Sequence, residues 1–394
     1  MQPKIYTENE HSIRQDDIDQ DALDIIFHLK NAGYTAYLVG GGVRDLLLHK
    51  KPKDYDISTS ARPEEVKRLF QRRCLLIGKR FRLAHIRHGK KVFECATFRA
   101  GDLENASLIV RDNQWGNAEE DVLRRDFTIN ALFYDPTTRT VIDYVNGVED
   151  IRHKILRTIG DPMIRFKQDP VRMIRLLKFH ARFGFSIDHK TERALHACKE
   201  EIMKSAPARL LEEFFKMLES GYASAFLDLM AAYDFLLILF PCFHHFLWGP
   251  SKTIAHEYLR AIDDFHRIRP APLHRSILLA AIVFPILEQE LNTLTQDRGR
   301  PLSMQDVLHL SETLLNGIDT TSFAHFPRRL MMGAHLVTTN QFRLTPFNTK
   351  PKFHGRFTKT EEFYYSLQFL GIRTKVRHEL KDIYEDWKKS AGKA

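Results

Sequence analysis

The feature of the sequence that most constrains the fold is a change of hydrophobic pattern near residue 155. Up to that point, short apolar runs typical of buried strands alternate with helical patterns, whereas beyond it the apolar segments have helical periodicity. We therefore predict an α/β head over residues 22–155, preceded by a polar lead-in over residues 1–21 and followed by an all-helical remainder. Strands are expected at 34–39, 54–58, 83–88, 91–99 and 141–144. Helices are expected at 22–29, 43–49, 64–71, 170–183, 190–204, 207–220, 222–240, 252–267, 273–291 and 303–316.

Composition narrows the class of protein. The 394 residues are too many for one compact core, so more than one domain is expected. Apolar residues make up 43% and charged residues 28%, which excludes a disordered chain. No apolar run is long enough to cross a membrane and the first residues are polar, so we expect no membrane span and a cytoplasmic location. The four cysteines lack metal-ligand spacing, which fits a reducing compartment and argues against a zinc site.

The positive charge is concentrated in two tracts. The chain has 59 basic and 50 acidic residues, a net charge of +9, which suggests a polyanionic partner. Residues 72–99 contain nine basic residues and one acidic residue, and residues 323–360 contain seven basic residues, six phenylalanines and no acidic residue. Cations beside aromatic rings suit a single-stranded nucleic acid, although the phenylalanines could equally be helical core. Contacts to RNA are predicted at Lys79, Arg80, Arg82, Arg328, Arg329, Arg343, Lys350, Lys352 and Arg356.

A glycine-rich turn follows the first expected strand. Gly40, Gly41 and Gly42 stand between that strand and a short helix. Backbone N–H groups in such a turn can approach a phosphate, and Arg44 can add a charged contact. No Gly-Lys-Ser/Thr follows, so this is not a Walker loop, and a plain tight turn is the alternative.

Paired aspartates come next. Asp54 and Asp56 stand two apart in an expected strand, so their carboxylates are predicted to share one face. Two adjacent carboxylates favour a cation between them, and oxygen ligands suit Mg²⁺ bound together with substrate phosphates. Glu94, in another expected strand, is a candidate third carboxylate. The alternatives are a polar turn for the aspartates and an exposed pairing of Glu94 with Arg99.

Two further clusters combine arginines with a carboxylate. Arg124 and Arg125 precede Asp126, and the arginines can bind triphosphate oxygens while Asp126 supports them or acts on the reacting group. A capped helix start is the alternative.

The second cluster opens the helix expected at 170–183. Arg172, Arg175 and Lys178 recur on one helix face, behind Asp169 as N-cap and Pro170 at the first helical position. A carboxylate and a guanidinium together match a base edge with an NH₂ donor beside a ring-nitrogen acceptor. Adenine and cytosine offer that edge, and guanine and uracil do not. This leaves ATP and CTP as alternatives, and leaves open that Asp169 is only a cap.

These residues together resemble a known family. The strings LVGGGVRD at 38–45, DYDI at 54–57, RRDFTIN at 124–130 and DPVRMIR at 169–175 are similar to the bacterial poly(A) polymerase and tRNA nucleotidyltransferase family of the polymerase-β superfamily. The block LIGKRFRLAHI at 76–86 looks like the one that marks the poly(A) polymerase branch.

The resemblance implies an α+β fold. A polymerase-β-like nucleotidyltransferase head, a mixed sheet with flanking helices, would be followed by an all-α neck (156–222) and an all-α body with a C-terminal RNA-binding region (223–394). Asp54, Asp56 and Glu94 would hold metal, with Asp126 as the other supporting acid. The nucleotide contacts implied are Gly41, Gly42, Arg44, Arg124, Arg125, Asp169, Arg172, Arg175 and Lys178. One departure matters: the family usually has glutamate where this chain has Gln168, which could loosen base selection.

The expected activity is template-independent addition of AMP from ATP to RNA 3′ ends, with release of pyrophosphate and with two Mg²⁺ ions. A CCA-adding tRNA nucleotidyltransferase using CTP and ATP is one alternative, and a catalytically silent RNA-binding protein is another. The expected partners are RNA 3′ ends and ATP, with RNA-degradation machinery or an RNA chaperone as candidate protein partners and a monomer as the expected state.

Overall fold

A computed structural model of the chain describes residues 2–78, 83–101, 107–108, 114–249, 252–269, 271–298, 302–345 and 356–391. The chain divides into two compact units, residues 1–201 and residues 202–394. The predicted neck, residues 156–222, contributes segments to both units. Each unit is described by itself.

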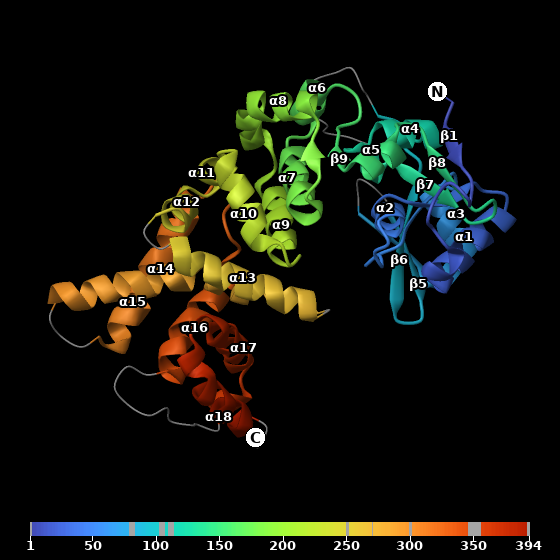
Figure 1. The fold of residues 1–394 in the computed structure, drawn as a ribbon. Helices are drawn as coiled ribbons and strands as arrows, with labels where there is room; N and C mark the ends of the chain where they lie inside the picture. The colour runs from blue at the N-terminus through green and yellow to red at the C-terminus, as the bar shows by residue number, and fades with distance from the viewer. Residues whose placement is uncertain are drawn as a thin grey trace. The chain divides into compact units, whose positions relative to one another are not determined.

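The first unit is built on a mixed eight-stranded sheet, which confirms the predicted α+β head (Figure 1). The strand order is β1-β8-β7-β2-β3-β6-β5-β4, with β3 parallel to β6 and the other neighbours antiparallel. The strands are β1 (Lys4–Tyr6), β2 (Ala36–Val39), β3 (Asp56–Thr59), β4 (Cys74–Ile77), β5 (Leu83–His88), β6 (Lys91–Thr97), β7 (Leu132–Asp135) and β8 (Thr140–Asp143). Figure 1 shows β5 and β6 as a long hairpin.

Most helices of this unit lie where the sequence predicts them, but those at Ala118–Leu123, Gly147–His153 and Pro162–Gln168 were not predicted. The helices of this unit are α1 (Gln20–Asn31), α2 (Gly41–Leu47), α3 (Pro63–Phe70), α4 (Ala118–Leu123), α5 (Gly147–His153), α6 (Pro162–Gln168), α7 (Val171–Phe183) and α8 (His189–Ala197), beside a small parallel pair, β9 (Ile155–Leu156) and β10 (Ser186–Ile187). Pro63 occupies the first turn of α3, and Gly184 ends α7 in the left-handed conformation. Core packing joins β2 to α4: Val39 and Phe133 cluster with Phe98 and Val122.

One predicted strand begins later than expected. The prediction started it at Asp54, but β3 begins at Asp56, which pairs with Val39, the last residue of β2. The partner strand β2 ends at Val39, because the chain turns away at Gly40. Asp54 therefore has no residue of β2 to pair with. The sequence did not predict β1, β4 or β7. Strand β1 lies inside the predicted polar lead-in and pairs with β8.

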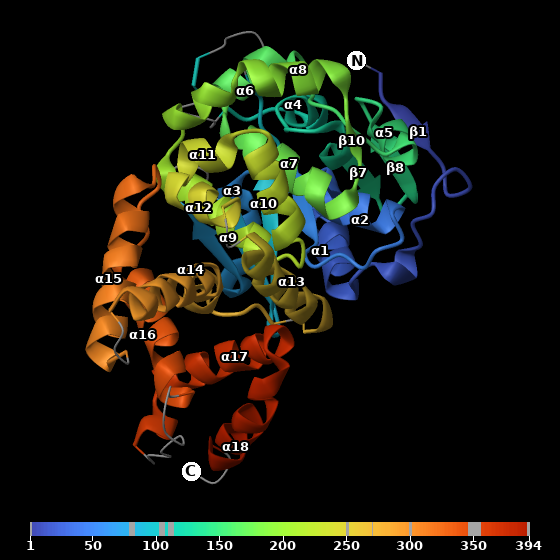
Figure 2. The same cartoon turned by 60° about the vertical axis from the view of Figure 1, so that its left-hand side comes forward.

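The second unit is all-helical, as predicted. Its helices are α9 (Pro207–Leu218), α10 (Ala223–Ala232), α11 (Phe235–Leu239), α12 (Pro241–Leu247), α13 (Lys252–Ile268), α14 (Arg275–Arg298), α15 (Met304–Thr321), α16 (Arg328–Leu344), α17 (Glu361–Val376) and α18 (Lys381–Ala391). Helix α14 packs against α13, α15, α16 and α17, and α17 also packs against α18 (Figure 2). Among the described residues, one stretch, Arg275–Asp297 of α14, is long and apolar enough to cross a membrane, and 67% of its most apolar window is buried. Such burial is what the core helix of a folded domain shows.

The phenylalanines of the tract at 323–360 pack inward rather than offering rings for base stacking. Phe326 is buried and its ring contacts Phe215 and Phe240, while Phe342 is buried against Phe284. Phe357 packs on Phe363 and Trp387. Phe323 is half-buried, and Phe347 and Phe353 lie outside the described residues. Phe326, Phe342 and Phe357 therefore pack in the helical core, as the alternative interpretation expects. The sequence did not predict α16, which lies inside the tract and contains Phe342.

We predict that Gly40→Ala destabilises the first unit by about 1–3 kcal/mol. Gly40 precedes α2 with φ 70° and ψ −126°, a conformation that a residue with a Cβ atom rarely adopts, and a Cβ atom there would lie 3.4 Å from Nη1 of Arg125. Thermal melting of the purified variant measures the loss. Gly41→Ala is the control, because Gly41 has no positive φ and should cost much less. Equal losses for the two variants would contradict the prediction.

Candidate active site

Three carboxylates come together at the start of β3. Ile57 pairs with Cys95 in the parallel β3–β6 register, which places Asp56 next to Glu94. Burial, followed by the negative charges of Glu94 and Asp54, raises the pKa of Asp56 to about 6 against the opposing charge of Arg125. Asp54, Asp56 and Glu94 therefore form one electrostatic cluster, which we call the carboxylate cluster.

The glycine turn lies against this cluster. A Cβ atom on Gly42 would lie 3.4 Å from the main-chain oxygen of Asp54, so the turn and the Asp54 segment are in close contact. Gly40 makes the equally close approach to Arg125 already described. The absence of side chains in the turn therefore lets an acidic segment and a guanidinium approach the same backbone.

Glu94 projects outward from β6. Its side chain is 54% exposed and its Oε1 lies 3.6 Å from Nε2 of His85, its direct cross-strand neighbour on β5. The alternative pairing with Arg99 is wrong: Arg99 is buried, and its main-chain N–H donates to Asp121. Glu94 is thus held by one weak contact, which leaves its carboxylate turned toward solvent beside Asp56.

Arg124 and Arg125 are fixed by an aspartate that the sequence reading did not single out. Asp121 is buried in α4, where its Oδ1 accepts from Nε of Arg124 at 2.9 Å and its Oδ2 accepts from Nη2 of Arg125 at 2.7 Å. Burial raises the pKa of Asp121, but the two guanidinium groups outweigh it and lower that pKa. Arg125 also donates to Ser58 Oγ on β3 at 3.2 Å, which directs it to the cluster strand. Both arginines are therefore preorganised for an anion.

Asp126 lies in a different environment from the carboxylate cluster. It is buried, its Oδ2 pairs with Nη2 of Arg175 at 2.9 Å, and its Oδ1 accepts from Asn130 Nδ2 at 3.2 Å. Burial alone would raise the pKa of Asp126, but Arg175, Asn130 and the Phe127 N–H hold it below its usual value. Asp126 is also absent from the charges that shift the pKa of Asp56. Of the two candidates for a third carboxylate, the geometry favours Glu94.

Arg44 is built into a buried network. Its Nε and Nη2 donate to Asp45 Oδ1 at 2.9 and 2.7 Å, and its Nη1 donates to Asn130. Arg182 of α7 donates to the other Asp45 oxygen at 2.9 Å. Rings of α7 also cover the Arg44 guanidinium. Arg44 thus ties α2 to α7, and its contact with a phosphate stays a prediction.

The predicted base-reading residues lie at the junction of α6 and α7. The N-cap prediction was one residue early: Pro170 occupies the N-cap of α7, and Asp169 ends α6 as its C-cap. Arg172 is buried and donates to the main-chain oxygens of Arg165 and Arg124, each at 3.2 Å. Its orientation is therefore fixed beside Asp169.

The other members of the α7 face have local partners. Arg175 pairs with Asp126, as described, and Lys178 Nζ lies over the Phe179 ring, 5.5 Å from its centroid. The predicted RNA contacts Arg328, Arg329, Arg343 and Arg356 are all exposed in the second unit. Lys79, Arg80, Arg82, Lys350 and Lys352 lie outside the described residues.

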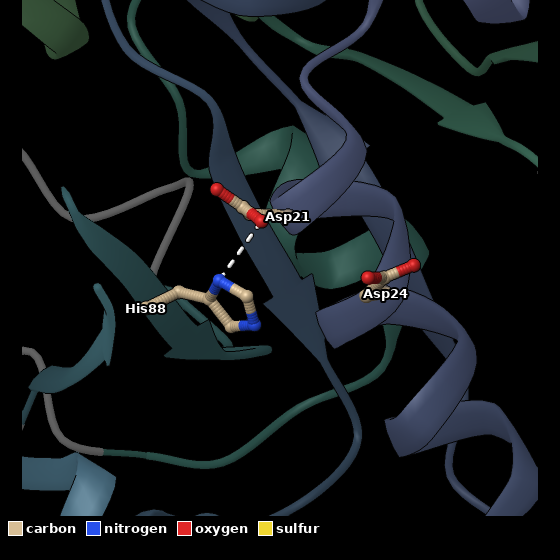
Figure 3. Close-up of side chains that lie close together, drawn as sticks. All are labelled: Asp21, Asp24 and His88. Atoms are coloured by element: carbon tan, nitrogen blue, oxygen red, sulfur yellow. Dashed lines mark ion pairs between the residues drawn. The ribbon is translucent and has the colours of Figure 1, made fainter. Parts of the chain in front are cut away.

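Among the described residues, one group has three ligand atoms close enough together to share a metal ion, and it is not the carboxylate cluster. Asp21 and Asp24 of α1 and His88 of β5 have ligand atoms within 4.8 Å of one another (Figure 3). Asp21 is already paired, however, with His88 Nδ1 at 2.8 Å and with Lys91 Nζ at 2.8 Å. Lys91 neutralises the charge of Asp21, and this ion pair in turn neutralises one cation of the basic tract at 72–99. The group is therefore explained as an ion-pair cluster.

Comparison with known proteins identifies the same family that the sequence motifs resemble. Residues 36–157 match the family profile of the poly A polymerase head domain, and residues 184–247 match the profile described as the probable RNA and SrmB-binding site of polymerase A. The chain is 38% identical to poly(A) polymerase I of Salmonella typhi over 402 residues, covering 97% of this chain and 84% of the relative.

CCA-adding enzymes are also similar. The chain is 40% identical to the CCA-adding enzyme of Lactobacillus helveticus over 205 residues, covering 51% of this chain and 50% of the relative. The crystal structure of the Bacillus stearothermophilus CCA-adding enzyme in complex with CTP has a TM-score of 0.62 and 24% identity, covering 95% of this chain and 82% of that one. At that identity the likeness concerns the fold.

We predict that Asp56→Asn stabilises the metal-free protein at pH 8 by roughly 1–3 kcal/mol and at pH 5 by roughly half as much. Because the folded state raises the pKa of Asp56, it holds the proton more tightly than the unfolded chain does. The free energy of unfolding therefore falls as pH rises from the unfolded pKa through about 6, and the penalty is complete at pH 8.

Melting temperatures in the presence of a chelator, at both pH values, check this prediction. Asp24→Asn is the control, because its carboxylate lies outside the cluster. A variant destabilised at both pH values would show that Asp56 is an ordinary structural carboxylate.

Proposed function

The chain belongs to the family of bacterial poly(A) polymerases and tRNA nucleotidyltransferases, and from that premise we propose that it adds AMP from ATP to RNA 3′ ends without a template, releasing pyrophosphate. Membership makes the chain a nucleotidyltransferase. The observation that carries the proposal is the carboxylate cluster beside Arg125 and the glycine turn. It combines a place for cations with a place for a polyphosphate.

The cluster fits divalent ions by the chemistry of its donors. Three carboxylates whose charges repel one another, as the pKa of Asp56 shows, are stabilised by a bound cation, and oxygen ligands suit Mg²⁺. Asp54, Asp56 and Glu94 would hold the ions, and we propose two of them. When bound, they would activate the 3′-hydroxyl and stabilise the charge of the departing pyrophosphate.

The arginines and the α6–α7 junction supply binding and orientation. Arg124 and Arg125, fixed by Asp121, would hold the triphosphate, with the N–H groups of Gly41 and Gly42 as further donors. Asp169 and Arg172 would read the base edge. Fixing both ends of the nucleotide would place its α-phosphate for attack by the RNA hydroxyl.

The extent of sequence similarity to the two kinds of relative supports the use of ATP alone rather than of both CTP and ATP. The poly(A) polymerase relative aligns with 97% of the chain, whereas the CCA-adding relative aligns with 51%. A CCA-adding activity is the second candidate, favoured by that shorter match and by the shared base edge of adenine and cytosine.

We propose RNA 3′ ends as the acceptor. The proposed division is a head over residues 22–155, a neck over 156–222 that reads the base, and a body over 223–394 that binds RNA. The exposed arginines at 328, 329, 343 and 356 support contacts to phosphates in that body. We further propose that the enzyme acts in the cytoplasm as a monomer, with RNA-degradation machinery or an RNA chaperone as candidate partners.

The proposal is tested by offering one nucleotide at a time, with Mg²⁺, to an unstructured RNA and to a tRNA that lacks its terminal residues. Long tails from ATP alone on the unstructured RNA are expected. Addition restricted to three residues on the tRNA, requiring CTP, would establish the CCA-adding alternative. RNA binding without any incorporation would establish the catalytically silent alternative.

We predict that Asp54→Ala lowers the rate of AMP transfer at least about 100-fold while leaving RNA affinity unchanged, because it removes one candidate metal ligand but no RNA contact. Single-nucleotide extension assays and RNA-binding titrations measure the two effects. Asp24→Asn serves as the matched loss of an exposed carboxylate and should leave transfer unchanged. Full activity of Asp54→Ala would remove this residue from the metal site.

A further inference from the structure

Arg165 is a buried cation that the catalytic scheme above does not use. It lies on α6 and is 1% exposed. Its Nη2 donates to the main-chain oxygens of both Arg124 and Arg125, each at 2.7 Å, and its Nη1 donates to Gln168 Oε1 at 2.8 Å. One guanidinium therefore bridges two segments about forty residues apart in the chain.

The acceptors of Arg165 are all neutral. Two are carbonyl groups at the end of α4, where helix carbonyls carry partial negative charge, and the third is a side-chain amide. Burial, together with the charge of the nearby Arg172, lowers the pKa of Arg165 to about 9. An ordinary core position would pair such a buried charge with a carboxylate, and among the described residues Arg165 forms no such pair. A costly arrangement of this kind suggests a role beyond stability.

The two bridged segments carry the two halves of the proposed nucleotide site. On one side, the carbonyl contacts fix the backbone from which the Arg124 and Arg125 side chains project. On the other side, Gln168 immediately precedes Asp169, and Arg172 donates to the same Arg124 oxygen that Arg165 binds. The phosphate arginines and the base-reading pair are therefore held to one shared set of backbone groups.

We propose that Arg165 is a positioning residue for nucleotide selection, which couples the triphosphate arginines to the base-reading pair Asp169 and Arg172. The inference rests on the proposed function of those residues. A nucleotide whose base matches Asp169 and Arg172 is held at both ends only while the distance between this pair and the triphosphate arginines is fixed. Loosening the bridge costs the matching nucleotide more than the mismatched one, because the mismatched base makes fewer contacts to lose.

Gln168 makes this bridge adjustable. A carboxylate at this position would give Arg165 a charge-assisted partner in place of an amide. The chain thus binds its bridging cation through the weaker kind of acceptor. Gln168→Glu should strengthen the contact without enlarging the side chain.

The test measures binding of ATP and of GTP to the full-length protein by calorimetry, without RNA, so that no turnover is required. Arg165→Lys keeps the charge but loses the forked geometry that reaches two carbonyls and an amide together. We expect the ratio of GTP to ATP dissociation constants to fall at least about tenfold in this variant. Gln168→Glu is expected to keep or raise the ratio and to raise the melting temperature.

The matched control is Arg373→Lys. Arg373 is a buried arginine of α17 in the second unit, with neutral partners Gln341 and Thr345 and an ion pair to Glu288 at 3.5 Å. Its replacement should lower the melting temperature without moving the nucleotide ratio. Gln168→Met, which removes one acceptor and leaves the carbonyl contacts, covers the case in which Arg165→Lys fails to fold, and it should lower the ratio.

An unchanged ratio in folded Arg165→Lys and Gln168→Met would overturn the proposal, and so would a wild type that binds ATP and GTP equally. Failure of the wild type to extend RNA would instead count against the proposed function, since the binding ratio is measured without RNA. The two ideas therefore fail on different observations.

Discussion

The repulsion among Asp54, Asp56 and Glu94 is the constraint on which the rest of the first unit depends. Three carboxylates converge at the start of β3, and the pKa of Asp56 rises to about 6 as a result of burial and of its neighbours' charges. A fold selected for stability alone would separate these groups. The sheet register, the close glycine turn and the position of Arg125 all serve to keep them together.

The positive side of the site is organised in the opposite way. Asp121 holds Arg124 and Arg125 from within α4, while Asp126 is neutralised by Arg175 from α7. Two acids only five residues apart thus have different structural roles. Asp121 orients Arg124 and Arg125, the proposed phosphate-binding cations, and Asp126 forms an ion pair with α7. Asn130 joins the second network to Arg44, so α2 and α7 are tied through one amide.

How much could be predicted from the sequence depends on how far apart in the chain the interacting residues lie. The change from a mixed head to a helical remainder and many of the individual helices follow from local periodicity, and Glu94 is a candidate from its residue chemistry, whereas the mixed sheet is what the family resemblance implies. Asp121 could have been found, because it stands three and four residues before two arginines on one helix. Arg165 gave no such signal, since its acceptors are backbone carbonyls set by tertiary packing. The late start of β3 depends on where its partner strand ends, and α16 was hidden by reading its phenylalanines as a binding feature.

The central claim is that Asp54, Asp56 and Glu94 form the metal site and that Asp126 does not belong to it. Titration of the protein with Mn²⁺, followed by the electron paramagnetic resonance of the free ion, tests this directly. The account predicts that Glu94→Gln weakens Mn²⁺ binding at least about tenfold, whereas Asp126→Asn leaves it unchanged. Weakened binding in Asp126→Asn together with unchanged binding in Glu94→Gln would contradict it.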